Sequence, residues 1–294
     1  MAEQALAGVA GAAPPPASTP YVLAGVMGWP VAHSRSPFIH NHWIAQYGLR
    51  GAYVQLPVRP ENLEAALCAL PTLGFAGCNL TIPHKVAALA LVDRVEPLAQ
   101  RIGAINTVVV EADGSLTGKN TDAFGYLHSL QESCPGWCAD AGPALVVGAG
   151  GAARAVVAAL LDAGVPQVRL CNRSQDKAQA IAMDFGPRVI TVPWNERAGA
   201  LADVALLVNT TNQGMHGEPA LDLALDPLPL NALVSDIVYV PQRTPLIEAA
   251  LARGNPVAYG LGMLIHQARP AFEAWFGVLP EASEALLHAV QARL

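Results

Sequence analysis

The segment Ala144-Leu-Val-Val-Gly-Ala-Gly-Gly-Ala-Ala153 decides the fold class of this chain. Its first four residues are apolar and predict a short strand, and the alanine-rich run that follows through Leu161 predicts a helix. The glycines between them match the G-x-G-x-x-A pattern of a dinucleotide-binding turn. Gly148 permits the turn, Gly150 allows pyrophosphate to approach, and Ala153 lets the helix pack on the strand. Because N–H groups at a helix start bind anions, the segment predicts a Rossmann-type, doubly wound nucleotide domain.

The end of the next strand, Gln167–Cys171, indicates which dinucleotide binds. An NAD site has an acidic residue here, about twenty residues after the turn, to bond the ribose hydroxyl. This chain has Asn172-Arg173-Ser174 instead, with Lys177 one turn further on. Charge-assisted hydrogen bonds from such groups suit a 2′-phosphate, so the sequence predicts NADP, although a solvated basic turn is the alternative. The predicted cofactor contacts are Gly148, Ala149, Gly150, Gly151, Ala152, Asn172, Arg173, Ser174 and Lys177.

Strands and helices alternate in the N-terminal half as well, which predicts an open α/β sheet with crossover connections. A helix is expected from Pro37, with Ser36 as its N-cap. The expected strands are Tyr21–Met27, Ala52–Val58, Cys78–Ile82 and Ile105–Val110, and further helices are expected over Glu61–Leu70, Val86–Val92 and Ala123–Leu130.

The run Asn79-Leu-Thr-Ile-Pro-His-Lys85 indicates a polar substrate site. In a strand, Asn79 and Thr81 would point to the same side, because side chains repeat every second residue. Pro83 suits the first turn of a following helix, which would place Lys85 near a helix N-terminus, where a cation is disfavoured. A lysine set against that preference beside two hydrogen-bonding groups favours a binding role. The alternative is an ordinary surface lysine.

Composition limits the other classes of function. Of 294 residues, 14% are charged and 52% hydrophobic, which is typical of a globular protein, and no apolar run reaches the ~18 residues of a membrane span. A net charge of -6 argues against nucleic-acid binding. Five cysteines predict no disulfide framework and favour a reducing, cytoplasmic location, and the histidines lack partners at metal-ligand spacing. Residues 1–20, rich in Ala, Gly and Pro and without Lys or Arg, are expected to form a flexible tail rather than a targeting signal.

Other polar clusters lie at expected element ends, and each of them alone also fits a purely structural role. Asn106 ends one strand, and Asp122 stands where a helix begins, so that a simple N-cap is one interpretation. The segment 209–215 follows an apolar strand and is expected to close over a nicotinamide. Residues 236–239 form another strand end, and Gly260 is expected to start a long terminal helix.

Taken in order, these motifs resemble the shikimate dehydrogenase family. The resemblance covers residues from about Tyr21 to the C-terminus and rests on Gly-Trp-Pro-Val-Ala-His-Ser-Arg-Ser-Pro, Asn-Leu-Thr-Ile-Pro-His-Lys, Gly-Ala-Ile-Asn-Thr, Asn-Thr-Asp-Ala-Phe-Gly, Gly-Ala-Gly-Gly-Ala, Asn-Arg-Ser and Gly-Leu-Gly-Met-Leu-Ile-His-Gln-Ala. It implies a substrate domain, residues 21–121, completed by C-terminal helices, residues 260–294. It also implies an NADP domain over residues 122–259 and a catalytic cleft between the two.

The resemblance also implies roles for individual residues. Ser34 and Ser36, helped by Tyr239, would bind the substrate carboxylate, and Lys85 with Asp122 would form the catalytic pair. The groups expected to bond the ring hydroxyls and the reacting oxygen are Asn79, Thr81, Asn106, Asp122 and Gln267. Thr210, Gly260 and Met263 join the expected cofactor contacts. The mild departures from the commonest family pattern are Leu80, His84 and Ser174.

The implied activity is the reversible, NADP-dependent reduction of 3-dehydroshikimate to shikimate, in the biosynthesis of chorismate and aromatic amino acids. Two alternatives stay open: a quinate or dual-specificity dehydrogenase, and a non-catalytic NADP-binding sensor on the same fold. The expected partner is a small-molecule substrate, without a membrane or nucleic acid, and the chain is expected to be a monomer or a homodimer.

Overall fold

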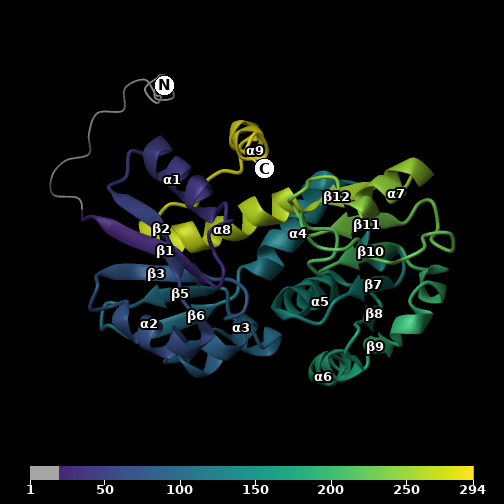
Figure 1. Ribbon diagram of the computed structural model, residues 1–294, viewed down its shortest axis with the longest axis horizontal. Helices are drawn as coiled ribbons and strands as arrows, with labels where there is room; N and C mark the ends of the chain where they lie inside the picture. Colours follow the sequence, from purple (N-terminus) through teal and green to yellow (C-terminus); the bar gives the residue numbers. More distant parts are fainter. Residues whose placement is uncertain (1–19, 294) are drawn as a thin grey trace.

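The structure is a computed structural model that describes residues 20–293. The tail predicted over residues 1–20 therefore lies, apart from Pro20, outside the described residues. Two six-stranded sheets with helices around them stand side by side, and the long helices α4 (Asp122–Ser133) and α8 (Gly260–Phe276) run between them (Figure 1). The α/β fold class predicted from the sequence is confirmed.

The first sheet has the strand order β2-β1-β3-β5-β6-β4. Its strands are β1 (Val22–Gly28), β2 (Gly51–Pro57), β3 (Phe75–Leu80), β4 (Arg94–Val95), β5 (Thr107–Val110) and β6 (Leu116–Lys119). Strands β1, β2 and β3 are parallel, as predicted, but β5 pairs antiparallel with both β3 and β6. The expectation of crossovers throughout this sheet was therefore wrong at one edge. The β5–β6 connection is a tight hairpin turn with Gly114 at a φ of +83°, too short for a crossover.

The second sheet is parallel throughout, in the order β12-β11-β10-β7-β8-β9. Its strands are β7 (Ala144–Val147), β8 (Val168–Cys171), β9 (Val189–Val192), β10 (Leu206–Asn209), β11 (Leu233–Asp236) and β12 (Val257–Tyr259). This is the order of a doubly wound nucleotide-binding fold, in which successive strands are added on one side of β7 up to β9 and on its other side from β10 onward, so that the strand order reverses between β7 and β10. Ligands bind such folds beyond the carboxyl ends of the strands at that reversal, which is where the glycine-rich turn lies.

Helices cover both faces of each sheet. The remaining helices are α1 (Ser36–Gln46), α2 (Leu63–Ala69), α3 (Pro97–Ile102), α5 (Gly151–Ala163), α6 (Gln175–Phe185), α7 (Pro245–Arg253) and α9 (Glu284–Gln291), and the short 3₁₀ helices are η1 (Pro60–Asn62), η2 (Ala87–Ala90), η3 (Ala139–Ala141), η4 (Trp194–Glu196) and η5 (Gly199–Leu201). The first sheet buries one face under α1, α8 and α9 and the other under α2, η2 and α3. On the second sheet, α4, α5 and α6 share one core, and α7 belongs to the core on the opposite face.

Four local predictions need correction. The N-cap of α1 is Arg35, and Ser36 is the first helical residue, because the Ser34 hydroxyl accepts the Ser36 N–H at 3.4 Å. The N-cap of α4 is Thr121 rather than Asp122. The helix expected over 61–70 divides into η1 and α2, and the strand expected over 78–82 ends at Leu80.

The helix expected over Val86–Val92 is also wrong, since only η2 forms there. The Lys85 carbonyl accepts a hydrogen bond from the Ile105 N–H at 2.8 Å, which ties this residue to the segment before β5 rather than to a following helical turn. Lys85 is therefore held by a neighbouring chain segment, and the helix-dipole argument for its unusual position does not apply.

Two glycines set how closely α4 and α8 approach each other. A Cβ atom added to Gly125 would lie 2.5 to 2.7 Å from Gln267 atoms, including its backbone N and Cα. One added to Gly262 would lie 2.3 Å from the Ser129 hydroxyl. Glycine at both positions thus permits a close crossing, which brings Gln267 of α8 beside the first turn of α4.

Candidate active site

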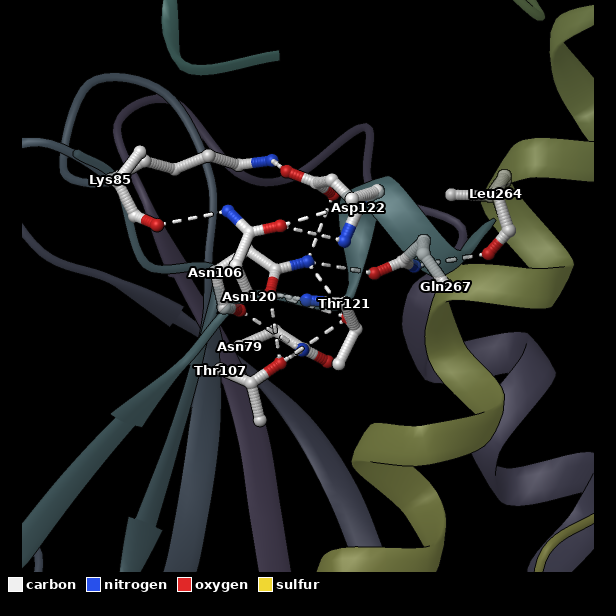
Figure 2. A network of polar contacts seen from close by, with 11 residues as sticks. Asn79, Lys85, Asn106, Thr107, Asn120, Thr121, Asp122, Leu264 and Gln267 are labelled. Carbon is white, nitrogen blue, oxygen red and sulfur yellow. Dashed lines mark hydrogen bonds and ion pairs between the residues drawn. The ribbon is translucent and has the colours of Figure 1, made fainter. Parts of the chain in front are cut away.

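Asn106 is the centre of a buried polar network at the ends of the strands of the first sheet (Figure 2). Its Nδ2 donates to Asp122 Oδ1 at 2.8 Å and to Thr121 Oγ1 at 2.9 Å. Its Oδ1 accepts from the Thr121 N–H at 2.8 Å and from the Thr107 hydroxyl at 3.1 Å. A residue just before β5 is thereby tied to the segment that starts α4, and its amide orientation is fixed.

Lys85 and Asp122 form an ion pair beside this amide. Lys85 Nζ lies 2.5 Å from Asp122 Oδ2, while Asp122 Oδ1 is the oxygen that accepts from Asn106. The Asp122 side chain is 5% exposed and that of Lys85 is 18% exposed. The Asn120 side chain accepts the Asp122 N–H at 3.0 Å and so fixes the start of α4. A nearly buried carboxylate thus orients an ammonium that still reaches solvent.

Asn79 joins the network, but Thr81 does not. Asn79 Nδ2 donates to Thr107 Oγ1 at 3.0 Å and to the Asn106 carbonyl at 3.1 Å, and its Oδ1 accepts from the Tyr53 hydroxyl at 2.6 Å. Thr81 follows the end of β3, and within residues 20–293 its side chain has no hydrogen-bond partner. Tyr53 was not predicted as a site residue, because an aromatic residue inside an ordinary strand does not indicate a functional role.

Gln267 reaches the same network from α8. Its Oε1 accepts from Asn106 Nδ2 at 3.3 Å, and its Nε2 donates to the Leu264 carbonyl at 3.0 Å, as Figure 2 shows. A helix from the C-terminal part of the chain therefore completes a site built from residues 79–122.

Ser34 and Ser36 lie in the loop and first turn that lead into α1. Between them stands Arg35, whose Nε is buried and has no hydrogen-bond partner in the described part of the chain. Tyr239 comes from the segment after β11, and burial raises the pKa of its hydroxyl while the Arg35 cation opposes that rise. A buried donor without an acceptor, beside two hydroxyls and a phenol, suits an anionic group. Sequence reasoning overlooked Arg35, although a cation between two serines was a readable signal.

The glycine-rich turn has the geometry that its motif requires. Gly148 has a φ of +119°, and a Cβ added there would lie 2.4 Å from Thr210 Oγ1, so the predicted residue Thr210 packs directly on the turn. An added Cβ at Gly150, the N-cap of α5, would meet nothing within 4 Å. Gly151 faces Lys85, whose Cβ would lie 3.4 Å from an added Cβ. The start of α5 is therefore open to a phosphate and adjoins the lysine of the ion pair.

The turn that follows β8 is exposed and basic. Asn172 Nδ2 donates to the Ser174 carbonyl at 2.9 Å and so shapes the turn, while Arg173 and Lys177 are exposed and form no ion pair among residues 20–293. Both cations are thus available to a phosphate. These features fit a bound NADP: a turn open to pyrophosphate and a basic end on the neighbouring strand.

The structure places the last two predicted cofactor contacts at the start of α8. A Cβ added to Gly260 would lie 2.4 Å from the Ile237 carbonyl oxygen, so glycine lets the chain after β11 pass closely. Met263 is buried, 8% exposed, in the core beneath α4 and α5.

A second buried carboxylate, Asp236, ends β11. Its oxygens accept from Asn209 Nδ2 at 3.0 Å, the Val238 N–H at 2.9 Å and the Thr244 hydroxyl at 2.7 Å. Burial raises the pKa of Asp236 to about 6, against the effect of these three donors. It anchors the loops that follow β10 and β11, including the segment expected to close over a nicotinamide.

The described residues contain neither a metal-ligand cluster nor a membrane-spanning helix. Across residues 20–293, no group of three or more His, Cys, Asp and Glu side chains is arranged to hold a metal ion. No helix in that part of the chain is both long and apolar enough to span a bilayer. The five cysteines are all free.

The fold and site define an α/β protein with two sheets, one of them in the strand order of a nucleotide-binding fold, and with a buried, charged polar network beside the glycine-rich turn. Three family models match the chain: the shikimate dehydrogenase substrate binding domain over residues 26–108, shikimate / quinate 5-dehydrogenase over residues 138–216, and the shikimate 5′-dehydrogenase C-terminal domain over residues 260–285. The NADP-dependent shikimate dehydrogenase of Paramagnetospirillum magneticum is 58% identical over 264 residues, which cover 90% of this chain and 96% of that relative. The chain belongs to the shikimate dehydrogenase family.

Solved structures agree with this assignment. Shikimate 5-dehydrogenase from Thermus thermophilus, in complex with NADP(H) and shikimate, superposes with a TM-score of 0.82 at 40% identity, covering 92% of this chain and 99% of that one. Quinate dehydrogenase from Corynebacterium glutamicum, in complex with NAD, superposes with a TM-score of 0.85 at 32% identity and the same coverage. The fold is thus shared by members that differ in substrate and cofactor.

Proposed function

We propose that this chain is an NADP-dependent shikimate dehydrogenase, which reduces 3-dehydroshikimate to shikimate and catalyses the reverse oxidation. The observation that carries the proposal is the place of the Lys85–Asp122 ion pair. It lies inside a buried polar network and directly against Gly151 at the start of the nucleotide-binding helix. Relatives named NADP-dependent shikimate dehydrogenase, at 58% and 55% identity, support the same activity.

Lys85 is the proposed proton donor. Reduced NADP, when bound, supplies the hydride for the carbonyl carbon. Negative charge then develops on the substrate's carbonyl oxygen, and the Lys85 ammonium stabilises that charge and gives up a proton to it. Asp122 holds the amine in place through the 2.5 Å contact, and Asn106 fixes the carboxylate in turn. Such acid–base assistance contributes ~10²–10⁴-fold to a rate.

The remaining groups would hold the ring. Ser34, Ser36 and Tyr239 are proposed to bind the substrate carboxylate, with the half-buried Arg35, whose Nε is buried without a partner in the described part of the chain, supplying the opposite charge. Gln267 Oε1 accepts from Asn106 Nδ2, and both side chains would bond ring hydroxyls. Asn79 has both amide hydrogens engaged by protein acceptors, so its contact with substrate would be through a free lone pair on Oδ1. Thr81 keeps a free hydroxyl for the same purpose.

NADP is the proposed cofactor because of the basic turn after β8. Asn172, Arg173, Ser174 and Lys177 offer hydrogen bonds and positive charge to a 2′-phosphate, and no carboxylate ends that strand. The contacts proposed for the rest of the cofactor are Gly148, Ala149, Gly150, Gly151, Ala152, Thr210, Gly260 and Met263.

A spectrophotometric assay tests the proposal directly. Reduction of NADP and of NAD is followed with shikimate and with quinate at equal concentrations. Fast turnover of shikimate with NADP is the expected result. If none of the four combinations turns over, the proposed activity is wrong and the NADP-binding sensor remains.

Quinate oxidation is the second candidate, because the quinate dehydrogenase structure superposes as well as the shikimate enzymes do. Quinate carries an additional hydroxyl beside its carboxylate, so selectivity would depend on Ser34 and Ser36. Faster turnover of quinate than of shikimate in the same assay would favour this candidate. A monomeric or homodimeric state and a cytoplasmic location stay predictions from the sequence.

A further inference from the structure

A continuous chain of four hydrogen bonds runs from Tyr53 in β2 to the Asp122 carboxylate. Tyr53 donates to Asn79 Oδ1 at 2.6 Å, and Asn79 Nδ2 donates to Thr107 Oγ1 at 3.0 Å. The Thr107 hydroxyl donates to Asn106 Oδ1 at 3.1 Å, and Asn106 Nδ2 donates to Asp122 Oδ1 at 2.8 Å. Every member is buried, and every member donates to the next one, so the chain ends on the carboxylate that orients Lys85.

Backbone groups fix the direction of this chain. The Asn106 carbonyl can only accept, so the Asn79 atom facing it at 3.1 Å must be the amide nitrogen. The Thr121 N–H can only donate, so the Asn106 atom facing it at 2.8 Å must be the amide oxygen. With both amides fixed, the Thr107 hydroxyl accepts from Asn79, and the acceptor nearest to it is the Asn106 oxygen at 3.1 Å, closer than Thr121 Oγ1 at 3.5 Å. The Tyr53 hydroxyl has to donate, because the Asn79 oxygen faces it.

The fold also holds the Tyr53 ring rigidly. The Asn41 side chain accepts the Tyr53 N–H at 3.0 Å and donates to its carbonyl at 2.8 Å. The ring stacks on His40, with the two ring centroids 4.0 Å apart and an angle of 3° between the ring planes. The Trp275 ring packs against it with a centroid distance of 6.0 Å. Burial lowers the pKa of His40 to about 3, so the stacked ring is neutral. Burial likewise raises the pKa of Tyr53 well above its ordinary value, so the phenol keeps the proton that it donates.

We infer that Tyr53 is a positioning residue for the reaction, which acts on Asp122 through Asn79, Thr107 and Asn106. Hydrogen bonds arranged head to tail polarise one another, and a donor at the far end strengthens the last bond to the carboxylate. Without the Tyr53 hydroxyl, Asn79 Oδ1 loses its partner inside the protein, and the restraint on both amides weakens. The inference rests on the proposed function, because it assigns Tyr53 a part in the step proposed for Lys85 and Asp122.

Tyr53→Phe removes the donor and retains the ring that stacks on His40. We expect kcat/KM for shikimate to fall about 3- to 10-fold, carried by kcat, while the KM for NADP stays unchanged. Tyr47→Phe is the matched control: its hydroxyl accepts the Glu281 N–H at 3.2 Å, outside the hydrogen-bond chain, and the same substitution should leave kcat/KM within about two-fold. A Tyr53→Phe enzyme that matches the control overturns the inference.

Interrupting the hydrogen-bond chain at Thr107 gives an independent test that does not depend on the folding of the Tyr53 variant. Thr107→Val keeps the shape but removes the hydroxyl, whereas Thr107→Ser keeps the hydroxyl. We expect the valine variant to lose at least as much kcat as Tyr53→Phe, the serine variant to recover most of it, and the double variant Tyr53→Phe/Thr107→Val to lose no more than Thr107→Val alone. Equal losses in the serine and valine variants, or additive losses in the double variant, overturn the inference. Wild-type turnover is measured alongside. If the wild type does not turn over, the proposed function is refuted, whereas the ratio of each variant's kcat to that of the wild type tests the role of the hydrogen-bond chain.

Discussion

The proposed substrate site and the proposed cofactor site differ in how their polar groups are held. On the substrate side, Asn79, Asn106 and Asp122 are 5%, 2% and 3% exposed, and they bond to one another and to neighbouring backbone groups. On the cofactor side, Gly150 faces open space, and Arg173 and Lys177 are exposed without an ion pair in the described part of the chain. A buried, preorganised network can stabilise developing charge, whereas an open basic turn attracts an anion. In the proposed function, the buried network would carry the chemistry and the basic turn would carry the choice of cofactor.

The two buried carboxylates, Asp122 and Asp236, also differ in the kind of partner that each has. Asp122 has a cation, Lys85, at 2.5 Å, while the partners of Asp236 are three neutral donors. Burial without a compensating cation raises the pKa of Asp236 to about 6. A carboxylate paired with an ammonium can take part in proton transfer, whereas one held by loop residues serves to fix the loops. Burial alone therefore does not distinguish the carboxylate of the proposed catalytic pair from a structural one.

Removing the Lys85 amine should cause the largest effect. In Lys85→Ala, we expect kcat for shikimate oxidation to fall by at least about 10²-fold, because the acid–base group is lost. The dissociation constant for NADP, measured by calorimetry, should stay near the wild-type value, because the phosphate-binding turn is untouched. Lys119→Ala is a suitable control, since Lys119 pairs with Glu96 at 2.8 Å outside the network. A Lys85→Ala enzyme with near-normal kcat would remove this lysine from the mechanism.

Removing the Arg173 guanidinium tests the cofactor side. We expect Arg173→Ala to raise the KM for NADP by about 10- to 100-fold, the loss of one charge-assisted hydrogen bond, and to leave the KM for NAD and kcat almost unchanged. Arg94→Ala, which removes an exposed arginine of β4, should change neither constant. An equal loss for NADP and NAD would mean that Arg173 does not recognise the 2′-phosphate.

The second sheet was more predictable than the first for a physical reason. Strand β7 and the turn after it are specified by local sequence, because the turn needs glycine where φ is +119° and the strand is buried on both faces. In the first sheet, β4 has only two residues, too few for a hydrophobic period to appear, and β6, although as long as β7, is followed by no glycine-rich turn. Their pairing depends on neighbouring strands and on the β5–β6 hairpin, which local patterns do not encode.

The candidate site divides in the same way. Lys85 and Asp122 could be named from the sequence because they stand in recognisable motifs, but the expected reason for the position of Lys85, a helix start, was wrong. Arg35 was overlooked although it stands between two serines in the sequence, whereas Tyr53 could not be identified from the sequence because its importance depends on the Asn79 amide oxygen that lies across from it. Contacts between distant segments supply that information, and a single sequence does not contain them in readable form.

The raised pKa of Asp236 yields the smallest expected effect, on stability rather than on rate. A folded-state pKa of about 6, above the unfolded value near 3.8, means that the folded protein binds this proton more tightly. The stability from Asp236 is therefore present at low pH and is lost as pH rises from about 4 to about 6. The shift corresponds to at most about 3 kcal/mol, and we expect about 1–2 kcal/mol once the loops relax.

Urea unfolding of the wild type and Asp236→Asn at several pH values from 4 to 7 measures this contribution, because other titrating groups cancel in the difference. The variant should gain stability relative to the wild type as pH rises through that window, and the difference should level off above pH 6. Asp226→Asn, at an exposed site of the same half, should show no such trend. A constant difference across the window would mean that Asp236 does not titrate there.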